Sequence, residues 1–321
     1  MKNDYKILLD ELKSTAQHDE LPLETVEQDY AISFLLKAMS ESPDLAGSLV
    51  FRGGTALRKC YFTHYRYSMD LDYSVRESIS LEEYNRALEH VAKAAQELFL
   101  SSHPGNQFEV FVKLIRGRDT HNDNQDSHKF VVKFPWHAKQ KDPYRGGRTI
   151  KLDTSHSEPV LLNAEQRSLI HPYSTGIESD VLCLCMDEIL AEKYVAMCHV
   201  ALKIEGLQRQ STRPRDYFDF EYGLSHAGLK DKTDFLCAAM IKADRRGLQL
   251  RSIEELTSGS SLSALERDWE PFLGDVVSKL SDCRQMTKEL QRKMKELFPD
   301  FAGSLKASRQ QAAELKVKRA G

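Results

Sequence analysis

The sequence lacks the features that would direct it to a membrane or to an oxidising compartment. No apolar run approaches the ~20 residues that a membrane helix needs, and the charged N-terminal segment MKNDYKILLDELK has no apolar signal-peptide core. Six cysteines among 321 residues form no CxxC pair and lie mostly in apolar runs. This usage favours reduced core residues over a disulfide framework. We therefore expect a cytoplasmic protein without membrane contact.

A large excess of charge of one sign is also missing. Lysine and arginine number 45, aspartate and glutamate 48, and the formal net charge is −3, so the whole chain offers no basic field to nucleic acid. A local basic stretch, residues 133–151, nevertheless contains Trp136 and Tyr144 among Lys133, His137, Lys139, Lys141, Arg145, Arg148 and Lys151. Cationic side chains can meet an RNA backbone while aromatic rings stack on bases. The stretch is a candidate RNA surface, and a solvated loop explains it as well.

Two common site signatures are absent. Cys183, Cys185 and His199 lack the ligand spacings of a structural zinc site. No GxxxxGK[ST] segment occurs, so the chain has no P-loop of the Walker A type. Zinc-finger and P-loop interpretations are therefore disfavoured.

Hydrophobic spacing predicts an α/β (α+β) core with a mixed sheet, followed by a helical region. Short apolar or alternating runs predict strands, and longer runs with helical spacing surround them; the strands are expected at 49–52, 67–75, 107–116, 128–136 and 148–153. After a last short strand near residues 181–185 the pattern is helical, apart from the linker-like residues 257–263, TSGSSLS. We predict two domains, residues 1–175 and 176–321.

The most informative stretch is residues 49–75, LVFRGGTALRKCYFTHYRYSMDLDYSV. A strand ends at Gly53 and Gly54, a short helix follows, and a second strand presents Asp70 and Asp72 on one face. Such a carboxylate pair suits Mg²⁺, although a polar edge strand is the alternative. Glycine amides at a helix start approach phosphate closely, although a plain turn uses the same residues. Together the two features describe a site for a nucleoside triphosphate and its Mg²⁺.

FRGGTALRKCY followed by YRYSMDLDY resembles the AbiEii/AbiGii-type toxin nucleotidyltransferases of the DNA polymerase β-like superfamily. The signature of that superfamily is a GG or GS turn followed by an acidic DxD pair. Lys193 in DEILAEKYVAM and the segment STRPRDYFDF at residues 211–220 match the lysine helix and the RxRDxxD segment of the family. The resemblance implies a polymerase β-like nucleotidyltransferase core at residues 1–175. It also implies that the helical domain at 176–321 completes the active-site cleft.

The resemblance implies roles for the residues around the glycine turn. Gly53, Gly54 and Thr55 would cradle the β- and γ-phosphates of the nucleotide. Ser68, which we expect on the same strand face as the aspartates, would hydrogen-bond a phosphate. Arg66 would face the same site, with a solvated arginine at the strand end as the alternative.

The resemblance also implies the catalytic set. Asp70 and Asp72 would hold Mg²⁺, or Mn²⁺ in its place, and lower the pKa of the attacking hydroxyl. Asp153 is a candidate third carboxylate, expected to face away from the core; an exposed aspartate at a strand end is its alternative. Lys193 would bind the triphosphate and its pyrophosphate leaving group. Asp216 would orient Lys193 or an arginine, or act directly.

The function implied by the resemblance is that of a bacterial toxin in a toxin–antitoxin or phage-defence system. It would transfer nucleotides from an NTP to an RNA acceptor, a tRNA 3′ end, and so block translation. A cognate antitoxin protein would be its partner. Two alternatives stay open: modification of a protein hydroxyl with a nucleotide or phosphate, and a non-catalytic nucleotide-binding protein.

Overall fold

The computed structural model describes residues 4–103, 111–116, 125–137, 145–205 and 212–320. The chain forms two compact units. The first consists of Met1–Val160 and Ala164–Cys183, and the second of Leu161–Asn163 and Leu184–Gly321. Each unit is described by itself below.

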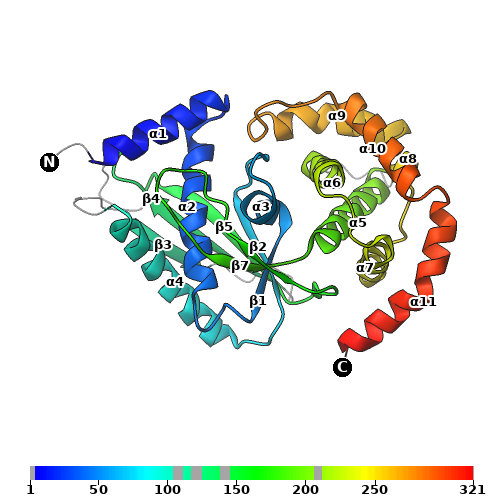
Figure 1. Cartoon of the computed structure of the whole chain (residues 1–321), viewed down its shortest axis with the longest axis horizontal. Helices are drawn as coiled ribbons and strands as arrows, with labels where there is room; N and C mark the ends of the chain where they lie inside the picture. The colour runs from blue at the N-terminus through cyan, green and yellow to red at the C-terminus, as the bar shows by residue number, and fades with distance from the viewer. Residues whose placement is uncertain (1–3, 104–110, 117–124, 138–144, 206–211, 321) are drawn as a thin grey trace. The chain divides into compact units, whose positions relative to one another are not determined.

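The first unit is built on a mixed seven-stranded sheet with the order β3-β4-β5-β2-β1-β7-β6 (Figure 1). Its strands are β1 (Leu49–Arg52), β2 (Asp70–Val75), β3 (Phe111–Arg116), β4 (Gln125–Lys133), β5 (Arg148–Ser155), β6 (Glu165–Ser168) and β7 (Asp180–Cys183). Strand β2 pairs antiparallel with β1 and parallel with β5. The predicted mixed sheet followed by a helical region is therefore confirmed.

Three long helices accompany the sheet: α1 (Asp4–His18), α2 (Leu23–Ser40) and α4 (Leu81–Ser101). Helix α2 contacts β5 and β7, and α4 packs against α2 and β3. Helix α4 begins with a capping box, in which the Ser80 side chain accepts from the Glu83 amide and the Glu83 carboxylate accepts from the Ser80 amide. These reciprocal bonds satisfy amide groups that a helix start leaves without partners.

The glycine turn leads into an irregular helix rather than a regular one. Helix α3 covers Gly53–Ala56 and continues as the π-helix η1, Leu57–Tyr61. The Phe62 amide closes the wider turn by donating to the Leu57 carbonyl at 2.9 Å. Strand β2 begins only at Asp70. The expectation that Ser68 lies on this strand is therefore wrong, and Ser68 belongs to the segment that precedes it.

An aromatic cluster occupies the interior of the first unit. Phe34 stacks on Phe99 with ring centroids 3.8 Å apart, and Tyr30 packs against Phe34 at 5.1 Å. The His171 ring lies 5.4 Å from the Tyr30 ring and 5.0 Å from that of Tyr173. Burial, and then the charge of Lys59, lower the pKa of His171 from 6.5 to about 3, against the opposing effect of Asp29.

We expect His171 to make the protein less stable in mild acid. Its imidazole binds a proton in the unfolded chain below pH 6.5 but stays neutral in the fold until about pH 3. Stability is thus lost as the pH falls through this window, by at most about 1.4 kcal/mol per pH unit. His171→Phe should reduce the stability difference between pH 7.5 and 5.0 in urea unfolding. Replacement of the exposed His90 by Gln is the control, and an unchanged difference in His171→Phe would contradict the assignment.

The second unit is helical. Its helices are α5 (Met186–Glu205), α6 (Pro214–His226), α7 (Lys232–Arg245), α8 (Ile253–Leu256), α9 (Gly259–Leu273), α10 (Cys283–Leu297) and α11 (Phe301–Ala320). Helix α5 packs against both α6 and α7. The predicted linker at residues 257–263 is wrong, because α9 begins inside it and buries Leu265, Trp269 and Leu273 at a spacing of four residues.

A buried glutamate in α5 holds a short piece of the chain that comes from between β5 and β6. Glu188 is fully buried, and its carboxylate accepts hydrogen bonds from the Leu161 and Leu162 amides at 2.8–3.1 Å. The Lys242 amine from α7 lies 2.9 Å from the same carboxylate. These contacts explain why Leu161–Asn163 belongs to the second unit.

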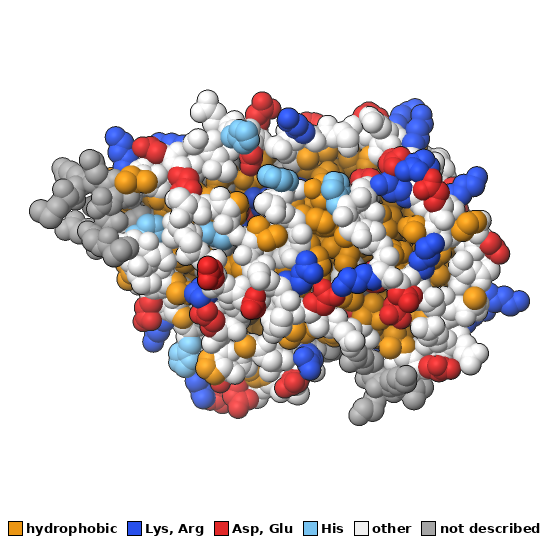
Figure 2. Space-filling model, viewed as in Figure 1, with side chains coloured by type: hydrophobic (Ala, Val, Ile, Leu, Met, Phe, Trp, Pro, Cys, Tyr) orange, Lys and Arg blue, Asp and Glu red, His pale blue; other side chains and the backbone are white. Residues whose placement is uncertain are grey.

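Acidic and basic side chains are interspersed on the face that Figure 2 shows, as the small net charge leads one to expect. All six cysteines lie in the described residues, where they are buried and form no disulfide. Within the described part of the chain, no helix combines the length and apolar character that crossing a membrane requires.

Candidate active site

Two glycines allow close contacts between the turn and the residues around β2. Gly53 adopts a positive φ of 79°, a backbone region that favours glycine. A Cβ atom at Gly53 would lie 2.6 Å from Oδ2 of Asp72. At Gly54 it would lie 2.3 Å from Nη2 of Arg66 and 3.2 Å from Oγ of Ser68. The structure therefore places Arg66, Ser68 and Asp72 directly against the glycine turn.

Thr55 fastens the turn to the start of β2. Its side chain is fully buried, and its hydroxyl donates to the Asp70 carbonyl at 2.5 Å while lying 2.8 Å from Oγ of Ser68. The hydroxyl is thus engaged with the protein itself. A phosphate at this turn would be bound by main-chain amides rather than by the Thr55 side chain.

Three aspartates gather on one face of two neighbouring strands. Asp70 and Asp72 are two residues apart on β2 and so point to the same side. Asp72 is the register partner of Asp153 on β5, and Asp70 is the partner of Lys151. Asp153 is buried and accepts a hydrogen bond from Ser127 on β4 at 2.6 Å. The alternative of an exposed aspartate at a strand end is therefore wrong.

Lys151, which the sequence analysis assigned to the basic stretch, lies instead among these carboxylates. Its amine donates to Oδ2 of Asp153 and forms an ion pair with it. Partial burial by itself lowers the pKa of Lys151, but the hydrogen bond and charge of Asp153 and the charges of Asp70 and Asp72 outweigh burial and raise it. Lys151 thus offsets part of the repulsion among the carboxylates.

Asp70 and Asp72 are the residues that could hold a cation together with a nucleotide. Among the residues that the structure describes, no three His, Cys, Asp or Glu side chains form a ready metal cluster. Mg²⁺ in nucleotide sites commonly takes only one or two carboxylates, with waters and phosphates as its other ligands. Asp70 and Asp72 can supply that number of oxygen ligands, and Asp153 is their neighbour.

The second unit contains the other predicted residues in one buried ion-pair network. The Lys193 amine on α5 lies 2.9 Å from Asp216 and 2.7 Å from Asp219, both on α6. Arg213, which precedes α6, pairs with the second oxygen of Asp216 at 2.8 Å. Lys193 is 9% exposed, Asp216 3% and Asp219 not at all. The amine is therefore held in a fixed position by two carboxylates.

The described part of the basic stretch is largely paired within the protein. Glu27 on α2, which the sequence did not single out, accepts from Trp136 at 2.6 Å and contacts His137 and Arg148. Burial raises the pKa of Glu27, but these hydrogen bonds outweigh it and hold the pKa below its ordinary value. Trp136 also stacks on Phe134 at 4.8 Å. The predicted contributions of Lys139, Lys141 and Tyr144 lie outside the described residues.

The glycine turn can be tested with a matched pair of alanine variants. Gly53 and Gly247 both adopt a positive φ, 79° and 63° respectively. Alanine in this backbone region costs about 1–2 kcal/mol of stability at each position. Only at Gly53 would the new Cβ also meet Asp72, because nothing lies within 4 Å at Gly247. We expect Gly53→Ala to lose more stability in urea unfolding and most of the nucleotidyl transfer that the sequence resemblance implies. Gly247→Ala should keep its transfer activity, and equal activity in both variants would rule out a role of the turn–Asp72 contact in transfer.

Comparison with protein-family models adds an independent finding. Residues 35–306 match the model of the nucleotidyl transferase AbiEii toxin of type IV toxin–antitoxin systems. The match covers most of the chain, including the glycine turn, the three aspartates and the Lys193 network. The chain therefore belongs to the AbiEii nucleotidyl transferase toxin family. Among curated proteins, a sequence comparison finds no match.

Proposed function

We propose that this toxin transfers a nucleotide from an NTP to the 3′ end of a tRNA, which blocks aminoacylation and translation. Family membership supports nucleotidyl transfer, and the sequence resemblance implies the tRNA acceptor. The observation that carries the proposal is the contact of the glycine turn with Asp72 at Gly53 and with Arg66 at Gly54. This arrangement suits a triphosphate whose charge is neutralised by the Arg66 guanidinium and by a cation bound at Asp72.

The nucleotide would be bound at the glycine turn. The amides of Gly53, Gly54 and Thr55 lie at the start of a short helix, where main-chain N–H groups are available to phosphate oxygens. The guanidinium of Arg66 and the hydroxyl of Ser68 lie against the same turn. Arginine suits this role because its planar donors match phosphate oxygens in pairs.

The three aspartates would organise the chemical step. Asp70 and Asp72 would hold Mg²⁺, which supplies charge neutralisation at the triphosphate and lowers the pKa of the attacking hydroxyl. The acceptor oxygen forms a bond to the α-phosphorus, the bond to the β-phosphate oxygen breaks, and pyrophosphate leaves. Asp153 would act as a further ligand or take the proton of the acceptor hydroxyl.

Lys193 would contribute positive charge to the triphosphate and the leaving pyrophosphate. The sequence resemblance implies this role, and the amine is held between Asp216 and Asp219. Asp216 would orient the amine, and Arg213 in turn holds Asp216. A cognate antitoxin protein, as type IV toxin–antitoxin systems imply, would restrain this activity in the cell.

The proposal is tested by incubating the protein with each labelled NTP, Mg²⁺ and total tRNA. Label on tRNA, lost when EDTA is added, is the expected result. Label on protein would favour modification of a protein hydroxyl instead. Nucleotide binding without any transfer would favour a non-catalytic protein. The Asp70→Ala variant should transfer no label, and full activity in that variant would overturn the assignment of the carboxylates.

A further inference from the structure

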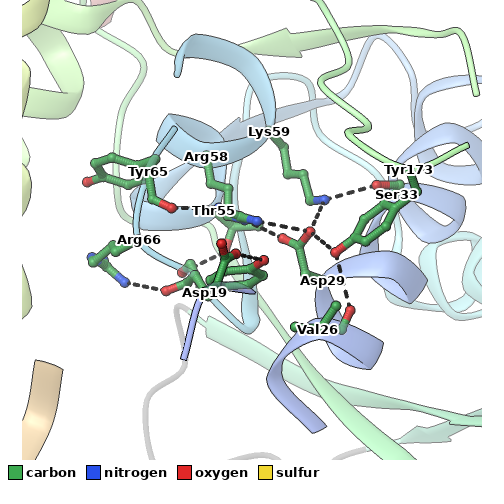
Figure 3. Close-up of polar contacts among 12 residues, drawn as sticks. Asp19, Val26, Asp29, Ser33, Thr55, Arg58, Lys59, Tyr65, Arg66 and Tyr173 are labelled. Atoms are coloured by element: carbon green, nitrogen blue, oxygen red, sulfur yellow. Dashed lines mark hydrogen bonds and ion pairs between the residues drawn. The ribbon is translucent and has the colours of Figure 1, made fainter. Parts of the chain in front are cut away.

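A buried charge network joins helix α2 to the π-helix η1, which follows the glycine turn. Asp29 is fully buried, and its carboxylate accepts from Arg58 Nε at 2.5 Å, from Lys59 at 2.9 Å and from the Tyr173 hydroxyl at 2.8 Å (Figure 3). Burial by itself raises the pKa of Asp29, but the charges of Arg58 and Lys59 outweigh it and hold the pKa well below its ordinary range. The carboxylate is therefore an ionised anchor on α2.

Arg58 and Lys59 both belong to the π-helix that follows the glycine turn. Helical segments of this kind are rare and occur frequently at functional sites. The carbonyls near the end of η1 are satisfied from elsewhere in the first unit. The Ile170 amide donates to the Lys59 carbonyl at 2.7 Å, and Nε of Arg167 donates to the Cys60 carbonyl at 3.2 Å. These two hydrogen bonds thus stabilise the wide turn of the π-helix.

Only one of the two cations reaches beyond Asp29 to the segment before β2. Nη1 of Arg58 donates to the Tyr65 carbonyl at 2.6 Å, and its guanidinium lies 3.5 Å over the Tyr67 ring. Lys59 donates instead to Ser33 on α2 at 3.0 Å. Arg58 therefore joins three parts of the unit: α2, the π-helix and the segment around Tyr65.

That segment contains two of the three side chains that lie against the glycine turn, Arg66 and Ser68. Arg66 directly follows Tyr65, and its Nη1 donates to the Tyr67 carbonyl at 3.0 Å. The Tyr67 hydroxyl is fixed in turn by donating to Asp19 at 2.6 Å. A shift of the Tyr65 carbonyl would be transmitted through one peptide to Arg66 and through three to Ser68.

We propose that Arg58, anchored by Asp29, is a positioning residue that holds the segment from Tyr65 to Ser68 so that Arg66 and Ser68 face the triphosphate. Arg58 itself is buried, and the proposal assigns it no contact with the nucleotide. The inference rests on the proposed function for its ligand, an NTP. The proposal gives the Arg58–Asp29 ion pair a role in nucleotide affinity in addition to its role in the stability of the fold.

Lys59 provides a matched control for Arg58. Both side chains are buried, both pair with Asp29, and they are neighbours on the same π-helix. Arg58→Met and Lys59→Met each remove one buried cation from the same carboxylate, so both should lower stability. Only Arg58→Met also removes the bond to the Tyr65 carbonyl. A difference between the two variants therefore reports positioning rather than general destabilisation.

The test uses the full chain and two measurements at a temperature where all variants are folded. The first is the equilibrium affinity for each of the four NTPs with Mg²⁺; the second is amide hydrogen exchange of peptides that cover residues 64–70. Arg58→Met should lower NTP affinity at least tenfold and accelerate exchange in this segment. Lys59→Met should change affinity less than twofold and leave exchange there close to wild type.

Arg58→Lys keeps a charge for Asp29 but is too short to make both contacts, and it serves if Arg58→Met does not fold. It should be folded and still lose NTP affinity and protection of residues 64–70. Wild-type affinity and exchange in the Arg58 variants, or equal losses in the Lys59 variant, would overturn the proposal. If the wild type binds no NTP, the proposed function fails, and the exchange comparison still decides whether Arg58 positions the segment.

Discussion

Asp72→Asn is expected to lower the rate of nucleotidyl transfer by at least ~10³-fold, a loss of about 4 kcal/mol of transition-state stabilisation. Asp72 lies against the glycine turn and is the register partner of Asp153, so it is central to the group of carboxylates. Asparagine has nearly the same shape, but it lacks the negative charge with which the carboxylate would bind Mg²⁺. The measurement is the initial rate of label transfer from the preferred NTP to tRNA.

The same change should leave the protein at least as stable as the wild type. Three carboxylates on one sheet face repel one another, and removal of one charge relieves part of that repulsion. Asp126→Asn is the matched control, because Asp126 lies on β4, which β5 separates from β2, and pairs with the exposed His156 at 2.7 Å. Its transfer rate should stay close to that of the wild type. A stable and active Asp72→Asn variant would refute the proposed cation site.

Lys193→Met should lower both stability and activity. The change leaves Asp216 and Asp219 buried without the amine between them, and loss of one partner from a buried ion pair costs about 3–5 kcal/mol. Arg213 still pairs with Asp216, which places the expected loss toward the lower end. Urea unfolding measures the stability change. Transfer per folded molecule should fall by about 10²–10³-fold if the amine stabilises the leaving pyrophosphate.

Lys242→Met separates these two effects. Lys242 is a buried amine in the same unit, and it too lies between two carboxylates, Glu188 at 2.9 Å and Glu192 at 3.0 Å. It should lose stability to a similar extent but retain wild-type transfer when assayed below its unfolding midpoint. If both lysine variants lose activity in parallel with stability, Lys193 has a structural role only. A selective loss in Lys193→Met supports the proposed catalytic role.

Local patterns predicted the parts of the fold that depend on residues close in sequence. Strand β1 and the glycine turn that ends it lie within a few residues of each other, so their order is visible in the sequence. Strand β6, with the sequence EQRS, gave no signal because it has no apolar alternation; its side chains alternate between half-buried and exposed. The start of α9 was misread because its polar first turn precedes the buried residues that stabilise it.

The candidate site was predictable where residue order carries the chemistry and unpredictable where distant partners decide it. Asp70 and Asp72 are two residues apart, so one strand sets both on one face. Asp29 and Glu27 resemble solvated helix residues in the sequence, yet both are fully buried. Their burial depends on Arg58, Lys59, Trp136 and Arg148, which come from segments 29–121 residues away. The hydrophobic spacing within α2 cannot indicate that charged partners from distant segments will bury these two carboxylates.

The hydrogen bonds from the Leu161 and Leu162 amides to Glu188 have a practical consequence for dividing this toxin into fragments. A polypeptide that ends at Cys183 would contain the Leu161 and Leu162 amides but not their acceptor, Glu188. A polypeptide that starts at Leu184 would contain the Glu188 carboxylate and its partner Lys242 but not the two amides. Neither piece is a self-sufficient module, even though contacts divide the chain almost at that point. Expression of the helical half therefore calls for residues 161–163 to be supplied as well, for instance by fusing them through a short linker ahead of α5.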